Sequence, residues 1–277
     1  MKKTVVAGSL VLDILPVFPH AVTSDMLLAE GKVTECQGMR IYMGGEVGNT
    51  GLALYRLGEP VFLISKTGND GAGFLIREMM KKEGVPSLIM ETEGISSTAS
   101  IALAVPGRDK STIHSRGASQ TFVADDIQGE LLKDADWFHF GYPTSMKTLY
   151  DRNGEELIRM LEKVKQYGLG ISVDMSLPDL NTDAGKTDWL PILEKALPYI
   201  DIFMPSIEEA VFLFMHREYQ EMAARYRGRD MTEVLSEAFI LTIADRALEM
   251  GTKAVLLKCG KRGMVLKTGD HFPWGES

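Results

Sequence analysis

Hydrophobic and polar positions along the chain alternate between short apolar runs and longer amphipathic segments. The amphipathic segments predict helices that separate the apolar runs. A strand and a helix in regular turn imply crossover connections, and hence a parallel sheet covered on both faces. The predicted buried strands are 4–10, 61–65, 137–141, 170–174, 200–204 and 254–258. The predicted helices are 52–58, the segment after the 67–73 turn to about 83, 154–167, 188–196, 207–215 and 238–250.

Two regions depart from this pattern. Residues 16–43 contain two alternating segments, 32–36 and 39–43. Residues 97–105 and 110–115 also alternate, on either side of a turn at 106–109. Alternation with a period of two predicts strands that expose one face. The first region fits a small antiparallel flap and the second a hairpin, and the two could pair as one small sheet. We expect residues 216–233 to be a solvated helical or loop insertion.

Composition narrows the classes of partner. The chain has 277 residues, of which 45% are hydrophobic and 25% charged, so it can bury the core of one large domain. The net charge is −8, and the basic residues are scattered, so we expect no nucleic-acid partner. No apolar stretch reaches the roughly 18 residues that span a bilayer, so we expect no membrane partner.

The cysteines and histidines do not suggest a metal centre. Cys36 and Cys259 lie far apart and lack the spacing of a metal site, which indicates free thiols in a reducing compartment, the cytoplasm. The five histidines form neither an HxxxH nor an HExxH pair, so we expect no metal site built on them.

Several predicted strands end in polar groups. In an open parallel sheet, ligands bind outside the carboxyl ends of the strands. Gly44 and Gly45 precede a helix whose first free N–H groups, with the amide of Asn49, suit a small hydroxylated ligand. A plain turn at Gly44-Gly45 and a solvated loop aspartate at Asp13 remain alternatives. The polar ends are Asp13, the turn from Gly44 to Asn49, Tyr142, Asp174 and the stretch from Ser206 to Glu209.

An ordered set of motifs gives these ends a context. With them, the chain resembles the ribokinase-like (PfkB-type) carbohydrate kinases over its whole length. The motifs are Val5-Val6-Ala7-Gly8-Ser9 with Asp13, Gly-Gly-x-x-x-Asn with Leu57-Gly58, the turn from Lys66 to Gly73, Gly117-Ala118, the segment from Pro205 to Ala210, and the segment from Lys258 to Gly263.

The resemblance implies a fold and an assembly. The fold would be α/β: a three-layer α/β/α ribokinase-like fold with a mostly parallel central sheet and a small β lid. Residues 1–277 would form one such domain, C-terminally incomplete, with lid segments at about 16–43 and 97–115. The lid would cover the sugar, and a homodimer through the lid is a further expectation.

The resemblance also implies ATP-dependent phosphorylation of a sugar hydroxyl, with Mg²⁺. Asp13 and Asn49 would bind sugar hydroxyls, Gly44, Gly45, Gly117 and Ala118 would contribute backbone groups, and Tyr142 would contact the substrate. Ser206, Glu209, Lys258, Gly260 and Gly263 would border the nucleotide. Glu209, the acidic end of the family's Asn-x-x-Glu motif, would act on Mg²⁺ indirectly.

The sequence departs from the family pattern at three places. Ser206 replaces the asparagine of Asn-x-x-Glu, and Lys258 stands where the family often has threonine. Lys258 could reach a phosphate, although we favour solvent or a local carboxylate. The Gly-Ala-Gly-Asp motif, which carries the catalytic aspartate, does not occur. We therefore expect that base beyond Ser277, and little kinase activity from the chain as printed.

Other functions stay open at this point. A nucleoside kinase is an alternative within the same class, and a non-catalytic sugar-binding or regulatory relative is an alternative from another. A dinucleotide-dependent oxidoreductase is disfavoured, because no GxGxxG follows the first strand.

Overall fold

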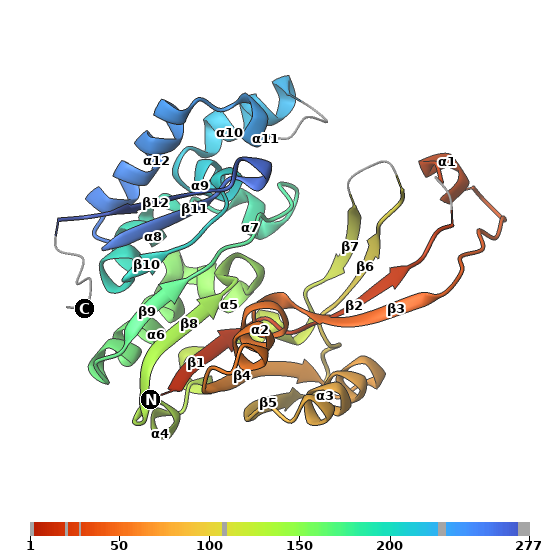
Figure 1. Cartoon of the computed structure of the whole chain (residues 1–277), viewed down its shortest axis with the longest axis horizontal. Helices are drawn as coiled ribbons and strands as arrows, with labels where there is room; N and C mark the ends of the chain where they lie inside the picture. The colour runs from red at the N-terminus through yellow and green to blue at the C-terminus, as the bar shows by residue number, and fades with distance from the viewer. Residues whose placement is uncertain (1–2, 20–21, 28, 107–109, 227–230, 271–277) are drawn as a thin grey trace.

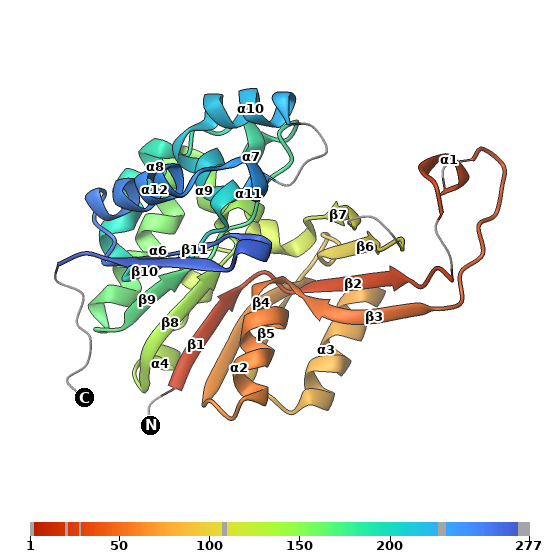
Figure 2. The same cartoon turned by 45° about the horizontal axis from the view of Figure 1, so that its top comes forward.

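The computed structural model describes residues 3–19, 22–27, 29–106, 110–226 and 231–270, and its strands form two sheets (Figures 1 and 2). The large sheet has the order β12-β11-β10-β9-β8-β1-β4-β5, and β12 is its one strand that pairs antiparallel in the described chain. These strands are β1 (Lys3–Gly8), β4 (Val61–Gly68), β5 (Ser87–Thr92), β8 (Ala135–Gly141), β9 (Gly170–Val173), β10 (Ile202–Phe203), β11 (Ala254–Lys258) and β12 (Met264–Thr268).

The small sheet has the order β3-β2-β6-β7 and extends away from the large one (Figure 1). Its strands are β2 (Val11–Pro16), β3 (Met39–Gly44), β6 (Ala99–Leu103) and β7 (Ser111–Ser115). Strand β2 follows β1 after two residues, so one segment of chain belongs to both sheets.

Helices cover both faces of the large sheet (Figures 1 and 2). The alternation within β1 shows why: Val5 and Ala7 pack into one hydrophobic cluster, while Val6 packs into a second one with Leu52 and Ile76. The helices are α1 (Ser24–Leu27), α2 (Leu52–Arg56), α3 (Gly71–Glu83), α4 (Gly129–Leu132), α5 (Lys147–Tyr150), α6 (Glu155–Gln166), α7 (Asp183–Lys186), α8 (Leu190–Ala196), α9 (Ile207–Phe214), α10 (His216–Arg225), α11 (Met231–Val234) and α12 (Glu237–Glu249). No helix of the described chain is long and apolar enough to cross a membrane.

The expected three-layer α/β fold with a mostly parallel sheet is confirmed, and four local predictions need correction. The first strand ends at Gly8, so Asp13 lies within β2 and not in a loop. Segment 32–36 forms no strand, because β2 is the strand that pairs with β3. Strand β5 was not predicted. Segment 216–233 is not simply solvated, since α10 and α11 bury Tyr219 and Met231.

Two predictions fall on residues outside the described ranges. Most of the turn expected at 106–109 lies there, and so does the chain end at Ser277.

The buried residue Ser9 joins three segments at the point where β1 becomes β2. Its N–H donates to the Gly141 carbonyl at 2.9 Å, and its carbonyl accepts from the Val47 N–H at 3.0 Å. Its hydroxyl accepts from the Glu46 N–H at 3.2 Å. Gly45 has a φ of +73°, and a Cβ there would lie 2.5 Å from the Ser9 carbonyl oxygen, so this position requires glycine.

A buried polar network lies next to this junction. Glu46 is fully buried, and its Oε1 lies 2.7 Å from His139 Nε2. His139 Nδ1 lies 2.7 Å from Ser172 Oγ, which also accepts from Trp137 Nε1 at 2.8 Å. An imidazole protonated at Nε2 donates to Glu46 and accepts from Ser172, which satisfies both ring nitrogens. The network ties the segment after β3 to strands β8 and β9.

The Glu46–His139 pair should contribute to stability. Glu46→Ala leaves a buried imidazole N–H without its acceptor, so we expect the free energy of unfolding at pH 7 to fall by about 1–3 kcal/mol. Denaturant unfolding followed by circular dichroism measures this. Glu130→Ala, at an exposed site on α4, is the matched control and should change little.

The contribution of the same pair to the free energy of unfolding should depend on pH. Burial raises the pKa of Glu46, but the hydrogen bond and charge of His139, with smaller contributions from Thr50 and Lys258, together outweigh burial and hold the pKa below its ordinary value. The contribution of the pair is therefore complete above about pH 4.5, the unfolded value, and is lost as the pH falls through the lower folded pKa. A difference between wild type and Glu46→Ala that grows below pH 4.5 would contradict this assignment.

Candidate active site

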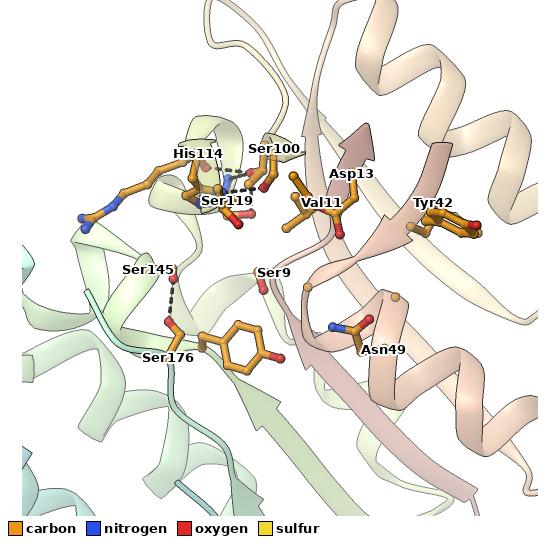
Figure 3. Close-up of a pocket in the computed structure, with 18 of the residues that line it drawn as sticks. Ser9, Val11, Asp13, Tyr42, Asn49, Ser100, His114, Ser119, Ser145 and Ser176 are labelled. Atoms are coloured by element: carbon orange, nitrogen blue, oxygen red, sulfur yellow. Dashed lines mark hydrogen bonds between the residues drawn. The ribbon is translucent and has the colours of Figure 1, made fainter. Parts of the chain in front are cut away.

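A pocket of about 1050 Å³ lies between the small sheet and the carboxyl ends of the central strands (Figure 3). Ser9 after β1, Tyr142 after β8 and Ser176 after β9 line its central side. Val11 and Asp13 of β2 line the side formed by the small sheet. The pocket thus lies where an open parallel sheet is expected to bind a ligand.

Four side chains form a polar row across the inner face of the small sheet, one from each strand. Strand register places Asp13 of β2 between Tyr42 of β3 and Ser100 of β6, and places Ser100 beside His114 of β7. Ser100 Oγ lies 2.9 Å from His114 Nδ1. All four line the pocket, which gives it carboxylate, hydroxyl and imidazole groups side by side.

The Asp13 carboxylate needs space that a glycine on the neighbouring strand provides. Gly44 pairs with Val11, and a Cβ on Gly44 would lie 2.0 Å from Asp13 Oδ2, so only glycine leaves room for the carboxylate. Burial raises the pKa of Asp13, while Ser100, Lys110 and His114 act in the opposite direction. Asp13 is therefore a partly desolvated acceptor that faces the pocket.

Asn49 and Tyr142 lie on the other side of the pocket. Asn49 belongs to a short π-helical turn, Val47–Gly51, and lies close enough to Tyr142 to lower the pKa of its hydroxyl in part. Burial and then the nearby carboxylates of Glu46, Asp174 and Glu209 raise the pKa of Tyr142 well above its ordinary value. Its phenol is thus protonated at neutral pH and can donate a hydrogen bond.

Some of the residues expected to bind substrate line the pocket, and others do not. Asp13, Gly45, Asn49 and Tyr142 line the pocket. Gly44 lies beneath Asp13.

Gly117 and Ala118 do not line the pocket. Both are buried, and the Ala118 N–H donates to the Ser96 carbonyl at 2.8 Å. Their neighbours Arg116 and Ser119 line the pocket in their place. Gly117 has a φ of +47°, a conformation that glycine allows in this turn.

A second group of predicted residues forms an acidic edge beside Tyr142. Ser206 caps α9: its Oγ accepts from the Glu209 N–H at 3.2 Å, and Glu209 Oε2 accepts from the Ser206 N–H at 2.6 Å. Burial raises the pKa of Glu209 to about 7, although Lys258 lowers it in part. At neutral pH this carboxyl group is therefore about half ionised.

Lys258 contacts a local carboxylate, one of the alternatives that the sequence left open. Its Nζ lies 2.5 and 2.6 Å from the two carboxylate oxygens of Asp174. Burial raises the pKa of Asp174, and the Lys258 charge opposes that rise. One lysine thus faces the carboxyl groups of Asp174 and Glu209 at the end of the sheet.

The residues of this edge fit a divalent cation whose other ligands are mostly water and phosphate. Within the described ranges, no three His, Cys, Asp or Glu residues cluster closely enough to hold a metal ion. Mg²⁺ commonly binds through one or two carboxylates, together with water and phosphate oxygens. Asp174 and Glu209 could supply the carboxylates. Gly260 and Gly263, with φ of +54° and +85°, shape the turn that follows Lys258.

Sequence reasoning missed several pocket residues. Ser9, Ser100, His114 and Arg116 line the pocket and were not predicted. The alternation of polar residues from Lys110 to Arg116 was a usable signal for the inner face of β7. The pairing of Glu46 with His139 had no local signal, because 93 residues separate them.

Comparisons with known proteins agree with this geometry. A family model described as "pfkB family carbohydrate kinase" matches residues 1–273. A protein from Archaeoglobus fulgidus, described as an uncharacterized sugar kinase, is 25% identical over 79% of this chain and 74% of its own length. Arabidopsis thaliana ribokinase, solved with ribose and ATP, has a TM-score of 0.68 at 20% identity and is matched over 96% of this chain and 75% of its own. An E. coli protein solved with ATP and Mg²⁺ has a TM-score of 0.68 at 21% identity, over 98% and 77% of the two chains. The chain belongs to the pfkB family of carbohydrate kinases.

Proposed function

We propose that this protein binds a sugar in the pocket and transfers a phosphoryl group from ATP, with Mg²⁺, to one of the sugar's hydroxyl groups. The observation that carries the proposal is the polar row on the small sheet opposite Asn49 and Tyr142, next to an acidic edge. A polyol presents paired donors and acceptors, which this set of groups matches.

On the sugar side, acceptors and donors face one another across the pocket. Asp13 accepts hydrogen bonds from sugar hydroxyls, and its raised pKa reflects the desolvation that strengthens such bonds. Asn49 both donates and accepts, and the protonated Tyr142 hydroxyl donates. These groups orient the acceptor hydroxyl toward the acidic edge, which is the main task in phosphoryl transfer.

On the phosphate side, Mg²⁺ would neutralise the charge of the phosphates when bound. Glu209 and Asp174 would orient the water ligands of the ion. Lys258 balances the charge of Asp174 before nucleotide binds. The turn from Gly260 to Gly263 would border the nucleotide. We assign no catalytic base, since Gly-Ala-Gly-Asp is absent from this sequence.

We assign the small sheet the role of a lid. It carries the polar row on its inner face, so closure over a bound sugar would exclude the water that competes with the sugar as phosphoryl acceptor. A nucleoside remains an alternative substrate within this mechanism. The cytoplasm is the proposed location, supported by two free cysteines.

The outer face of the same sheet supports a homodimer. Four isoleucines lie in one register row, one per strand: Ile41, Ile14, Ile101 and Ile113. Ile41, Ile101 and Ile113 are 42%, 40% and 62% exposed. A second copy of the chain is the proposed occupant, because an identical apolar row pairs with itself across a two-fold axis, and because β3 and β7 are free edges of this sheet.

A second candidate is a sugar-binding relative without kinase activity, favoured by Ser206 in place of the family's asparagine. Turnover of ATP, measured with a panel of sugars and nucleosides, separates the two. Sugar-dependent ADP formation supports the kinase. Sugar binding without turnover supports the non-catalytic relative, and a protein that neither binds nor turns over any member of the panel contradicts both.

Asp13→Asn should weaken sugar binding much more than it affects stability. A hydrogen bond to a charged group is worth roughly 1.5–3 kcal/mol, so affinity should fall about 10- to 150-fold. Isothermal titration calorimetry with the best-binding sugar measures this, and thermal unfolding checks the fold. Asp134→Asn, at an exposed site, is the control. Unchanged affinity in Asp13→Asn would refute the sugar-binding role.

Binding of Mg²⁺ with nucleotide should strengthen as the pH rises from 6 to 8. Glu209 has a folded pKa of about 7, so its carboxylate, the form that attracts the cation, gains population over this range. In Glu209→Gln, affinity should be lower at pH 8 and lack this rise. Calorimetry measures the affinity of both proteins at several pH values. The nucleotide itself titrates equally in both experiments, so the difference between the two pH profiles isolates the contribution of Glu209. Parallel pH profiles for the two proteins would exclude Glu209 as the cause.

Stability should show the opposite trend through the same group. The folded pKa of Glu209 lies above its unfolded value, so its contribution is complete below about pH 4.5 and is lost as the pH rises through 7. Glu209→Gln should therefore lose part of the wild-type decline in stability between pH 5 and 8, as measured by denaturant unfolding.

Ile113→Glu should disrupt the proposed dimer, because it would bury a charge at the contact. Sedimentation velocity should show a dimer for wild type and a monomer for the variant. The variant should keep its sugar affinity, since Ile113 faces away from the pocket. Ile95→Glu, an exposed isoleucine outside the row, is the control. A monomeric wild-type protein at high concentration would overturn this arrangement.

A further inference from the structure

Basic side chains lie at both ends of the inner face of β7. Lys110, Thr112, His114 and Arg116 alternate along the strand and its two flanking positions, and all four line the pocket. The opposite face carries Ser111, Ile113 and Ser115. Because β7 is an edge strand, this face forms one end of the pocket and is separate from the acidic edge at Tyr142.

Arg116 is the most informative of these residues. It is partly buried, and its guanidinium donates to the Tyr150 hydroxyl at 3.1 Å and to Thr182 Oγ1 at 3.0 Å. Both partners are neutral, and Arg116 makes no ion pair with a carboxylate of the described chain. The two hydroxyls fix the plane of the guanidinium and leave other N–H donors free for a ligand.

Another arginine at the pocket provides a contrast. Arg56 also lines the pocket, but its guanidinium lies 2.6 Å from Glu83 and is neutralised there. A partly buried guanidinium without a counter-charge is costly unless an anion completes the site. Among the described residues, the fold therefore keeps a charge at Arg116 that no carboxylate balances in an ion pair.

The carboxylates near this end have other partners. Asp179 accepts two hydrogen bonds from Asn181, at 2.9 and 3.1 Å. Asp183 lies 3.7 Å from Lys147. Asp13 lies two strands away, so an interstrand spacing of about 4.8 Å puts it roughly 10 Å from His114. A ligand with hydroxyls at one end and a charge at the other could span that separation.

His114 adds a hydrogen-bonding group beside Arg116. Burial and the charge of Arg116 lower the pKa of His114, so its imidazole is neutral at pH 7. Its Nδ1 lies against Ser100 Oγ, which leaves Nε2 as the ring nitrogen available to a ligand. Lys110, at the other end of β7, lies six residues or about 20 Å of extended strand from Arg116, and its charge acts on Asp13.

We propose that the substrate is a sugar with an oxyanionic substituent, a carboxylate or a phosphate, held by Arg116 with help from His114. This inference rests on the proposed sugar-binding function and specifies its substrate class. The hydroxyls lie toward Asp13 and Asn49, and the anion lies toward Arg116. Asp13 reinforces this orientation, because its carboxylate repels the charged end of the ligand.

Calorimetric titration with matched neutral and anionic sugars tests the proposal: glucose with gluconate, fructose with fructose 6-phosphate, and ribose with ribose 5-phosphate. The anionic member of at least one pair should bind 10-fold or more tightly, in keeping with the roughly 1.5–3 kcal/mol of a charged hydrogen bond. Tighter binding of gluconate alone assigns a carboxylate, and tighter binding of the phosphates alone assigns a phosphate. Equal affinities within every pair overturn the inference and leave sugar binding intact.

Variants locate the effect. Arg116→Met should abolish the preference for the anionic sugar while the neutral sugar still binds, and Arg116→Lys should keep part of that preference, because it retains the charge without the planar fork. Arg217→Met, at an exposed site on α10, is the control. A preference that survives in Arg116→Met overturns the proposal, and circular dichroism confirms that the variant is folded.

Inorganic phosphate provides a test that does not depend on sugar stereochemistry. An anion beside Arg116 should raise the pKa of His114, measured by NMR titration of the imidazole Cε1–H with assignment by His114→Gln. The shift should be absent in Arg116→Met. A shift with phosphate but no binding of any sugar would leave the anion site standing and refute the sugar-binding function. No shift with phosphate and no preference for anionic sugars would overturn the inference.

Discussion

The structure depends on the junction at Ser9, where one strand leaves the central sheet and enters the small one. Ser9 is only 2% exposed, and its polar groups bind the end of β8 and the start of the π-helical turn. Its glycine neighbours allow this crowding: a Cβ on Gly8 would lie 1.6 Å from the Gly141 carbonyl oxygen. The junction therefore fixes the relative positions of Asp13, Asn49 and Tyr142, which come from three separate segments.

The sequence predicted the layers of the fold well. The hydrophobic period of each strand and helix can be read from a short stretch of sequence, and the alternation of strands and helices then implies a parallel sheet between helical layers. It placed Asp13 just after the first strand, at a ligand-binding strand end or in a solvated loop, because a single strand was expected where β1 and β2 follow each other. It proposed ligand contacts for Gly44 and Gly45, and their lack of a side chain also makes room for Asp13 and Ser9. Close approach was thus expected from the glycine motif, but the approach of Asp13 and Ser9 was not.

The site could be predicted only in part, because its charges are set by partners distant in sequence. Lys258 is neutralised by Asp174, 84 residues away, and no local pattern shows that pairing. Arg116 shows the reverse case, since it bonds to the hydroxyls of Tyr150 and Thr182 and forms no ion pair with a carboxylate among the described residues. The two ends of the active-site region thus differ: carboxylates outnumber cations near Tyr142, and the Arg116 guanidinium lies at the end of β7.

Strand register connects both surfaces of the small sheet. Asp13 and Ile14 are adjacent in β2, and adjacent residues of a strand face opposite sides. The polar row inside the pocket and the isoleucine row outside therefore follow from one alignment of four strands. A slip of one residue would exchange the two rows, placing Ile14 in the pocket and a carboxylate on the outer face. The bonds of Ser9, four residues before Asp13, hold the start of β2 in place and oppose that slip. The same constraint that positions the sugar-binding groups thus also keeps the apolar row available on the outer face.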